Sequence, residues 1–218
     1  MYREVAERTL EYILRELTHP QGGFYCGQDA DSDGEEGKYY TFTPEEVRQV
    51  LGEEIGGLFC RLFDIEPSGN FEGRSIPNLL KNEEEFQEAG KLIPPETRKG
   101  LYEYRLQRTR LHKDDKILTS WNGLAIAAFA RAYQILEEPR YLKAAKEGAA
   151  FLLEHSMNQE GRLMLRYRDG EAAVPGQLDD YAFLIYGLLE LYRTKYEPIY
   201  LEQAGTLARK MIDLFWDE

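Results

Sequence analysis

The sequence has little cysteine and no long apolar run. Its two cysteines, Cys26 and Cys60, lie far apart and form no C-x-x-C pair. Thiols spaced in this way are more typical of a reducing compartment than of a disulfide-stabilised secreted domain. No apolar stretch reaches the roughly 20 residues of a membrane-spanning helix, and the acidic, amphipathic N-terminus does not resemble a secretion signal. We therefore expect a cytoplasmic protein with no membrane partner.

Basic residues are also fewer than acidic residues. The 218 residues include 27 Lys and Arg against 39 Asp and Glu, which gives a net charge of −12. Nucleic-acid surfaces need an excess of positive charge, so we expect no nucleic-acid partner. The sequence contains no P-loop, dinucleotide fingerprint or nucleophile elbow. Its three histidines, His19, His112 and His155, show no metal-ligand spacing, so no cofactor and no metal are predicted.

What the sequence does contain is an internal repeat. "EPRYLKAA" at 138–145 recurs as "EPIYLEQA" at 197–204, 59 positions later. The segments upstream of these two also correspond, 118–136 with 178–196. A third copy of the second element opens the chain and aligns Tyr2 with Tyr141. A fixed period of this length indicates stacked or circular helical repeats.

Each repeat contains two helices of different character. Residues 121–136 and 181–192 are apolar almost all round, which predicts helices that are buried on every side. The helix expected over 141–154 has one charged face and is half-exposed. An inner ring wrapped by an outer ring would produce this alternation, whereas an α-solenoid would contain two amphipathic helices per repeat. We therefore predict an all-α fold of α/α toroid type, a partial six-hairpin barrel resembling those of glycosidases and epimerases, with short β-hairpin excursions.

The predicted toroid is incomplete. Six pairs at this period would need about 350 residues by the one-unit-per-repeat logic of such folds, and both ends of the chain fall in mid-repeat. We expect residues 1–218 to form a single partial domain, with inner-helix surface at its cut edges that favours self-association. Between the repeats, Thr43-Pro44-Glu45-Glu46 predicts a helix start, 64–80 a loop and 95–110 another helix.

Acidic residues gather in the connections that lead from an outer helix to the next inner one. Because helix direction alternates, these connections must emerge at one end of the ring. A lone aspartate there usually caps a helix, but a doublet offers one carboxylate for the cap and one for the cavity. The candidate catalytic residues are Asp29, Asp31, Asp114, Asp115, Asp179 and Asp180.

Aromatic and amide side chains accompany these acids. The candidate substrate-binding residues are Tyr25, Trp121, Asn122 and Tyr181. Aromatic platforms beside carboxylates suit a sugar, which has apolar ring faces and hydroxyl edges. Two carboxylates across a cavity, about 6.5–9.5 Å apart in inverting enzymes, are the usual machinery of glycoside hydrolysis.

The stretch "DADSDG" at 29–34 also resembles the first half of a calcium loop. The twelfth position, which should supply a bidentate glutamate, is Tyr40. A β-excursion is the favoured alternative, with 23–25 and 38–40 as paired strands and an equivalent excursion at Gly161–Gly170. A calcium-stabilised scaffold stays open as the less favoured hypothesis.

Four long motifs together resemble the YyaL / spermatogenesis-associated protein 20 family: "GGFYCGQDADSDGEEGKYYTFTPEEV", "GNFEGRSIPN", "DDKILTSWNGLAIAA" and "LDDYAFLIYGLLELY". The resemblance implies an (α/α)6 toroid similar to N-acylglucosamine 2-epimerases and six-hairpin glycosidases, preceded in the family by a thioredoxin-like domain that this chain lacks. It implies no established activity. In epimerase-type toroids histidines transfer the proton, and no histidine lies on a predicted inner helix here.

Two functional hypotheses follow. The first is a carbohydrate-active domain, hydrolase or epimerase-like, that acts on a sugar or another small molecule. The second is a non-catalytic module that binds substrates or partners for the thioredoxin-like domain. The first requires at least two carboxylates that face one cavity, and the second requires an aromatic cavity without such a pair.

Overall fold

The computed structural model describes residues 2–217. The chain packs as two compact units: residues up to Gly27 together with those from Lys113 onward (unit 1), and Gln28–His112 (unit 2). Each unit has its own hydrophobic core. The expectation of a single partial domain over residues 1–218 stays a prediction.

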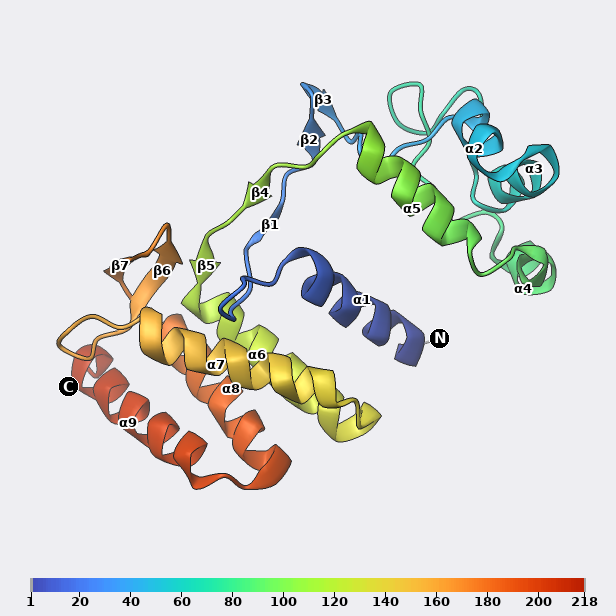
Figure 1. Ribbon diagram of the computed structural model, residues 1–218. Coiled ribbons are helices and arrows are strands. Elements are labelled where there is room, and N and C mark those ends of the chain that lie inside the picture. Colours follow the sequence, from blue (N-terminus) through green and yellow to red (C-terminus); the bar gives the residue numbers. More distant parts are fainter. Residues whose placement is uncertain (1, 218) are drawn as a thin grey trace. The chain divides into compact units, whose positions relative to one another are not determined.

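Unit 1 consists of helical hairpins. Its helices are α1 (Tyr2–Glu16), α6 (Thr119–Leu136), α7 (Pro139–His155), α8 (Leu178–Lys195) and α9 (Pro198–Phe215). Helices α6 and α8 lie side by side, α7 packs on α6 and α9 packs on α8 (Figure 1). The apolar helices therefore form an inner layer and the helices with a charged face an outer layer. This arrangement confirms the predicted all-α hairpin repeat.

Two glycines allow the inner helices to approach closely. A Cβ atom on Gly123 of α6 would lie 2.4 Å from the carbonyl carbon of Phe183 in α8. A Cβ atom on Gly187 of α8 would lie 2.7 Å from the carbonyl oxygen of Gly123. Real Cβ atoms do not tolerate such distances, so the backbone contact between α6 and α8 requires glycine at both positions.

The core of unit 1 lies between the two helical layers. Its largest fully buried side chains include Phe129 of α6, Tyr141 of α7 and Leu188 of α8. The expectation that α6 is buried on every side is wrong. Trp121 is 57% exposed and Ile135 74% exposed, and both lie on one stripe with Leu124. Helices α7 and α8 cover two sides of α6 and leave this third side open.

Strands of unit 1 precede its inner helices. The antiparallel sheet β5 (Ile117–Leu118), β6 (Met164–Arg168) and β7 (Glu171–Pro175) lies next to the first residues of α6 and α8, because β5 leads into α6 and β7 into α8. Asp169 and Gly170 join β6 to β7 with positive φ angles of 52° and 83°, as a type I′ turn requires. The predicted strand excursion at 161–170 is thereby confirmed. β1 (Gly27–Gln28) pairs with β4 (Lys113–Asp114) where the chain leaves unit 1 and returns to it.

Unit 2 is a smaller helical unit. It contains β2 (Asp31–Ser32), β3 (Glu35–Glu36), α2 (Pro44–Leu51), α3 (Glu53–Leu62), α4 (Glu83–Ala89), the 3-10 helix η1 (Gly90–Leu92) and α5 (Thr97–Arg108). Thr43 and Glu46 form a capping box at the start of α2, as the sequence predicts. The core includes Phe42, Val47 and Phe59. The predicted pairing of 23–25 with 38–40 is wrong, since Phe24 bridges to Thr18 and β2 pairs with β3.

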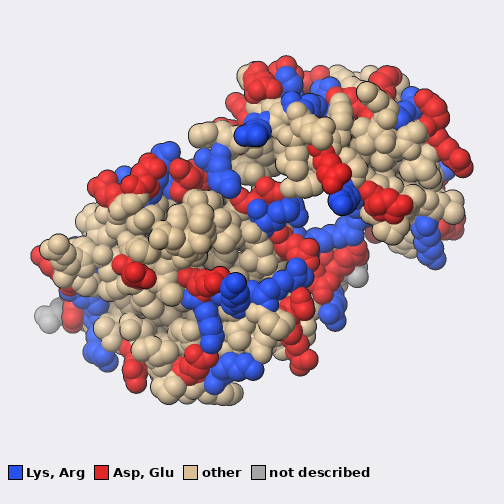
Figure 2. Space-filling view, viewed as in Figure 1, with Lys and Arg blue, Asp and Glu red and all other residues tan. Residues whose placement is uncertain are grey.

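The surface carries both signs of charge. On the face shown in Figure 2, acidic and basic side chains are interspersed rather than segregated. Among the described residues, no helix has the length and apolar character required to cross a bilayer.

Candidate functional site

Asp180 holds the first turns of the two inner helices together. Its carboxylate is 2% exposed. Oδ1 accepts a hydrogen bond of 3.0 Å from the Ser120 backbone N–H, and Oδ2 accepts one of 2.8 Å from Gln177 N–H. Burial raises the pKa of this carboxyl, and the hydrogen bonds from Gln177 and Ser120 act in the opposite direction. Asp180 therefore has a capping role at both helices and does not face a cavity.

Asn122 and Tyr181, predicted to bind substrate, are also structural. Asn122 is 1% exposed and clamps the backbone of Phe24, which donates to Oδ1 (2.6 Å) and accepts from Nδ2 (2.8 Å). Tyr181 is fully buried, and its hydroxyl oxygen accepts a hydrogen bond from Leu163 N–H. These contacts join the connecting segments to the inner helices. They remove both side chains from any surface on which a sugar could stack.

Asp115 and Tyr25 do share a cavity. It has a volume of about 150 Å³ and lies beside β5 and the β6–β7 turn; we call it the sheet cavity. Its lining includes His19, Tyr25, Asp115, Tyr167, Arg168 and Asp169. Asp115 Oδ1 lies 2.7 Å from Nε of Arg168, and Asp169 Oδ2 lies 3.5 Å from the same nitrogen. The cavity thus combines two carboxylates, a guanidinium and three rings.

The rings of the sheet cavity contact one another. The His19 ring lies 5.6 Å from that of Tyr25, in an edge-on arrangement, and 6.4 Å from that of Tyr167. Burial is the main cause that lowers the pKa of His19, and the charge of His155 contributes. Nδ1 of His19 accepts a hydrogen bond from Gln21 N–H, so the proton of the neutral ring is on Nε2.

Sequence reasoning missed four of these lining residues. His19 lies in the connection after α1 and not on an inner helix, where a histidine was sought. Tyr167, Arg168 and Asp169 belong to the strand excursion that was recognised only as a fold element. The "RYRDG" hairpin could have identified these residues from the sequence, because its turn brings Arg168 and Asp169 against the Asp114-Asp115 doublet.

The remaining candidates of unit 1 are accessible. Asp114 is paired with Lys116 at 2.9 Å, and this contact is the main cause that lowers its pKa. Trp121 and Asp179 are exposed and directly follow and precede the bonded pair Ser120 and Asp180. They therefore lie on the joined first turns of α6 and α8.

Asp29 and Asp31 lie in unit 2, Asp29 just before the β2–β3 hairpin and Asp31 within it. Both are exposed, and Asp29 Oδ1 accepts a hydrogen bond from Asp31 N–H. Asp33 and Gly34 form the turn between β2 and β3 with φ angles of 55° and 78°, which again is type I′ geometry. The motif therefore adopts the geometry of a hairpin turn and not that of a loop wrapped around an ion. Across residues 2–217 no group of three acidic, histidine or cysteine side chains could hold a metal.

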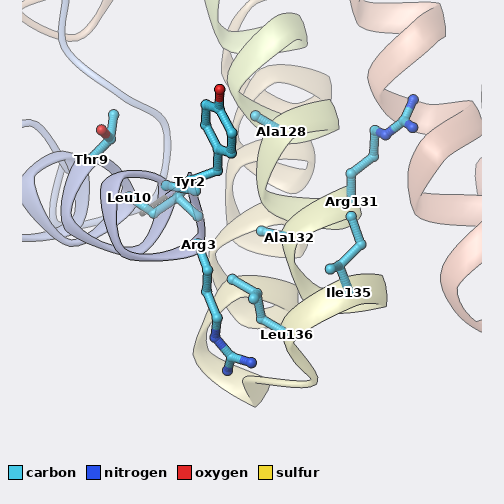
Figure 3. A pocket seen from close by; sticks show the side chains of 10 residues that line it. Tyr2, Arg3, Thr9, Leu10, Ala128, Arg131, Ala132, Ile135 and Leu136 are labelled. Atoms are coloured by element: carbon cyan, nitrogen blue, oxygen red, sulfur yellow. The ribbon is translucent and has the colours of Figure 1, made fainter.

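A wide hollow of unit 1 lies between α1 and α6, with a volume of about 610 Å³. Figure 3 shows Tyr2, Thr9 and Leu10 on α1 and Ala128 and Ala132 on α6 among its lining side chains. Tyr2 is 84% exposed, whereas its repeat equivalent Tyr141 is fully buried against α6. The predicted self-association would use apolar surface of this kind, and it stays a prediction.

Comparison with solved structures gives only distant likenesses. Cellobiose 2-epimerase from Bacillus thermoamylovorans has a TM-score of 0.42 at 15% identity and is matched over 99% of this chain and 55% of its own. A family 76 glycoside hydrolase (mannosidase) from Bacteroides thetaiotaomicron has a TM-score of 0.40 at 13% identity, over 97% of this chain and 71% of its own. At these values no residue, reaction or substrate is transferred to this chain.

Comparison of sequences gives closer relatives. No protein-family model matches the chain. Spermatogenesis-associated protein 20 from Homo sapiens is 32% identical over 257 aligned residues, which cover 99% of this chain. Uncharacterized protein B0495.5 from Caenorhabditis elegans is 33% identical over 94% of it. The chain spans 33% of the length of each of these relatives. The predicted resemblance to the YyaL / spermatogenesis-associated protein 20 family is therefore confirmed over nearly the full chain.

Proposed function

We propose that this chain is part of a carbohydrate-active α/α domain in which the sheet cavity binds one sugar unit. The observation that carries the proposal is that Asp115 and Arg168, a carboxylate and a guanidinium in contact, line the same cavity as the Tyr25 and Tyr167 rings. Ionic groups bind hydroxyls and rings pack on the faces of a sugar. At about 150 Å³ the cavity is smaller than typical ligand pockets of roughly 300–1,000 Å³, which suits one ring rather than an oligosaccharide.

The cavity supports epimerase-like proton transfer better than hydrolysis. Hydrolysis needs one carboxyl group as acid and another as base or nucleophile. Here Asp115 and Asp169 both lie against the Arg168 guanidinium, so neither is available as an unpaired acid. His19 supplies a different group: its lowered pKa favours the neutral imidazole, which accepts a proton near neutral pH.

The proposed chemistry assigns a role to each polar group. His19 accepts, on Nδ1 and in exchange for the hydrogen bond from Gln21 N–H, the proton from the carbon next to the carbonyl of an open-chain sugar, and returns it to that carbon of the resulting enediolate. The Arg168 guanidinium stabilises the oxyanion that forms on the carbonyl oxygen. Asp115 and Tyr25 bind sugar hydroxyls. Trp121 and Asp179 are proposed as a second contact surface at the first turns of α6 and α8.

Binding is tested first by thermal shift with mono- and disaccharides. A ligand present at a hundred times its dissociation constant stabilises the folded state by about 2.7 kcal/mol. Asp115→Asn should abolish the shift. Asp33→Asn is the matched control, since Asp33 is an exposed hairpin residue and Asn tolerates its positive φ. A shift that survives Asp115→Asn, or is lost equally in the control, would place the sugar elsewhere.

Catalysis is tested with each saccharide that binds. Incubation in D2O should introduce deuterium at the carbon next to the carbonyl, visible by NMR, and His19→Asn should abolish the exchange. His112→Asn is the control, because His112 is an exposed histidine outside the cavity.

A non-catalytic binding module is the second candidate. It is favoured by the contacts of Asp114 with Lys116, of Asp115 with Arg168 and of Asp180 with two helix starts, which occupy the predicted catalytic carboxylates. In the whole protein such a module would work with a thioredoxin-like domain. Saccharide binding without deuterium exchange, in this chain and in the full-length protein, would support it over the epimerase-like proposal.

A further inference from the structure

A second cavity lies in unit 2, along one face of α5. Its volume is about 180 Å³, and we call it the α5 cavity. Arg98, Leu101, Tyr102 and Arg105 of α5 line it at successive turns of the helix, and Phe42 and Phe59 contribute rings. Both phenylalanines are 5% exposed and belong to the core of unit 2. The cavity thus has an apolar floor.

The charge of the α5 cavity is entirely positive. Its lining contains two arginines and, among the described residues, no acidic side chain. Arg105 forms no ion pair with any residue of 2–217, although acidic residues outnumber basic ones in the chain. Its guanidinium carbon lies 4.4 Å from the Tyr39 ring centre and 5.4 Å from that of Tyr102. This guanidinium is therefore held by cation–π contacts with tyrosine rings and not by the ion pairs with carboxylates that are usual for arginine.

One donor of Arg105 is left without an acceptor. Its Nε is buried and donates no hydrogen bond within the part of the chain that the structure describes. Buried donors are nearly always hydrogen-bonded. The guanidinium donors lie in the plane of the group, so rings stacked on its face leave available the edge formed by the two Nη groups, which are not among the buried atoms. A planar anion with two oxygens is the acceptor that best matches this edge.

We propose that the α5 cavity binds a small aryl carboxylate, with the carboxylate on Arg105 and the ring over Phe42 and Phe59. Size supports this class of ligand, because an apolar cavity of about 150 Å³ is enough to hold a benzene ring. Arg98 also lines the cavity and is exposed. This site lies in unit 2 and does not depend on the proposed sugar site.

Benzoate is the probe, measured by isothermal titration calorimetry on the full 218-residue chain. We expect saturable binding, and binding at least about tenfold weaker for benzamide, which keeps the ring but lacks the charge. Arg105→Gln should weaken benzoate binding by at least about tenfold. The matched control is Lys99→Gln, which removes the same charge from α5 at a residue paired with Glu103 and outside the cavity lining, and it should leave the affinity within about twofold.

Three results would overturn the proposal: no saturable binding of benzoate, equal affinity for benzamide, or equal weakening by Lys99→Gln. The circular dichroism spectrum of each variant shows whether it is folded. If Arg105→Gln is unfolded, Arg105→Lys replaces it, since it keeps the charge and removes the planar two-donor edge. An Arg105→Lys chain that binds benzoate as tightly as the wild type would equally refute the site.

Discussion

The carboxylate of Asp180 accepts a hydrogen bond of 3.0 Å from the backbone N–H of Ser120, 60 positions earlier in the chain. The same side chain caps its own helix through Gln177. One buried carboxylate therefore satisfies donors at the starts of both α6 and α8. The first turns of the two inner helices, which carry Trp121 and Asp179, depend on this contact for their relative position.

Asp180→Ala should destabilise unit 1 by about 2 kcal/mol, since the loss of a side-chain cap costs roughly 0.5–2 kcal/mol and here two helices lose one. In a chain of this length this corresponds to a fall in melting temperature of roughly 4–8 °C. Calorimetry and urea unfolding measure it. Asp179→Ala is the control, because Asp179 is exposed. Equal melting temperatures for the two variants would contradict the capping role.

Gly123→Ala should cost more than a typical core substitution. The added Cβ would meet backbone atoms of Phe183 and Leu184 at 2.4–2.5 Å, and a backbone cannot rotate away as a side chain does. Overpacking costs typically 1–3 kcal/mol. Gly205→Ala in α9 is the opposite control, since its Cβ would have only Arg209 nearby, at 3.7 Å, and Ala in a helix is favoured over Gly by about 0.5–1 kcal/mol. Urea unfolding should therefore give shifts of opposite sign.

The helical hairpins were predictable because their signals are local and repeated. The recurrence of "EPRYLKAA" as "EPIYLEQA" and the contrast between apolar and half-charged helices fix the order of inner and outer elements. The exposed stripe of α6 was not predictable in the same way. A helix that is apolar on every side is expected to pack against other helices. The pattern does not show which side of the helix those neighbours leave uncovered.

The candidate site was predicted only in part. The acidic doublets lie in the connections that lead into inner helices, as predicted, but sequence does not show which member of a doublet caps. Asp180 makes the cap and Asp179 is exposed, while Asp115 of the other doublet reaches the sheet cavity. Asn122 and Tyr181 were misassigned because their contacts are with Phe24 and Leu163. Phe24 is 98 positions from Asn122, and no local pattern shows such a contact.

Calcium should have no effect on stability. Asp31 and Asp33 belong to the hairpin of β2 and β3, whose turn residues, Asp33 and Gly34, adopt the positive φ angles of a type I′ turn. Thermal unfolding in EDTA and in millimolar calcium should therefore give the same midpoint. As a control on the motif itself, the Asp31→Asn variant should also have the same midpoint in EDTA and in calcium. The calcium-stabilised scaffold would be supported if calcium raised the midpoint of the wild type but did not change that of Asp31→Asn.

Glu46 should make the stability of unit 2 depend on pH in the acid range. Its carboxylate accepts hydrogen bonds from Thr43 N–H, Arg74 and Arg108. Burial alone would raise the pKa of Glu46, but the Thr43 hydrogen bond and the charges of Arg74 and Arg108 lower it overall. Since the folded pKa is below the unfolded value of about 4.3, the stabilisation is present above that pH and is lost as the pH falls through the folded pKa.

Glu46→Gln provides the test of this sign. At pH 7 the variant should be less stable than the wild type by about 2 kcal/mol, because hydrogen bonds to a charged group contribute roughly 1.5–3 kcal/mol. The difference should shrink as the pH falls below about 4, where the wild-type carboxylate also loses its charge. Urea unfolding followed by circular dichroism at several pH values measures it. The control is Glu45→Gln, one position earlier and outside the arginine contacts, whose stability difference from the wild type should not shrink in this way. If the stability difference between Glu46→Gln and the wild type stayed constant or grew toward acid pH, the lowered pKa would be contradicted.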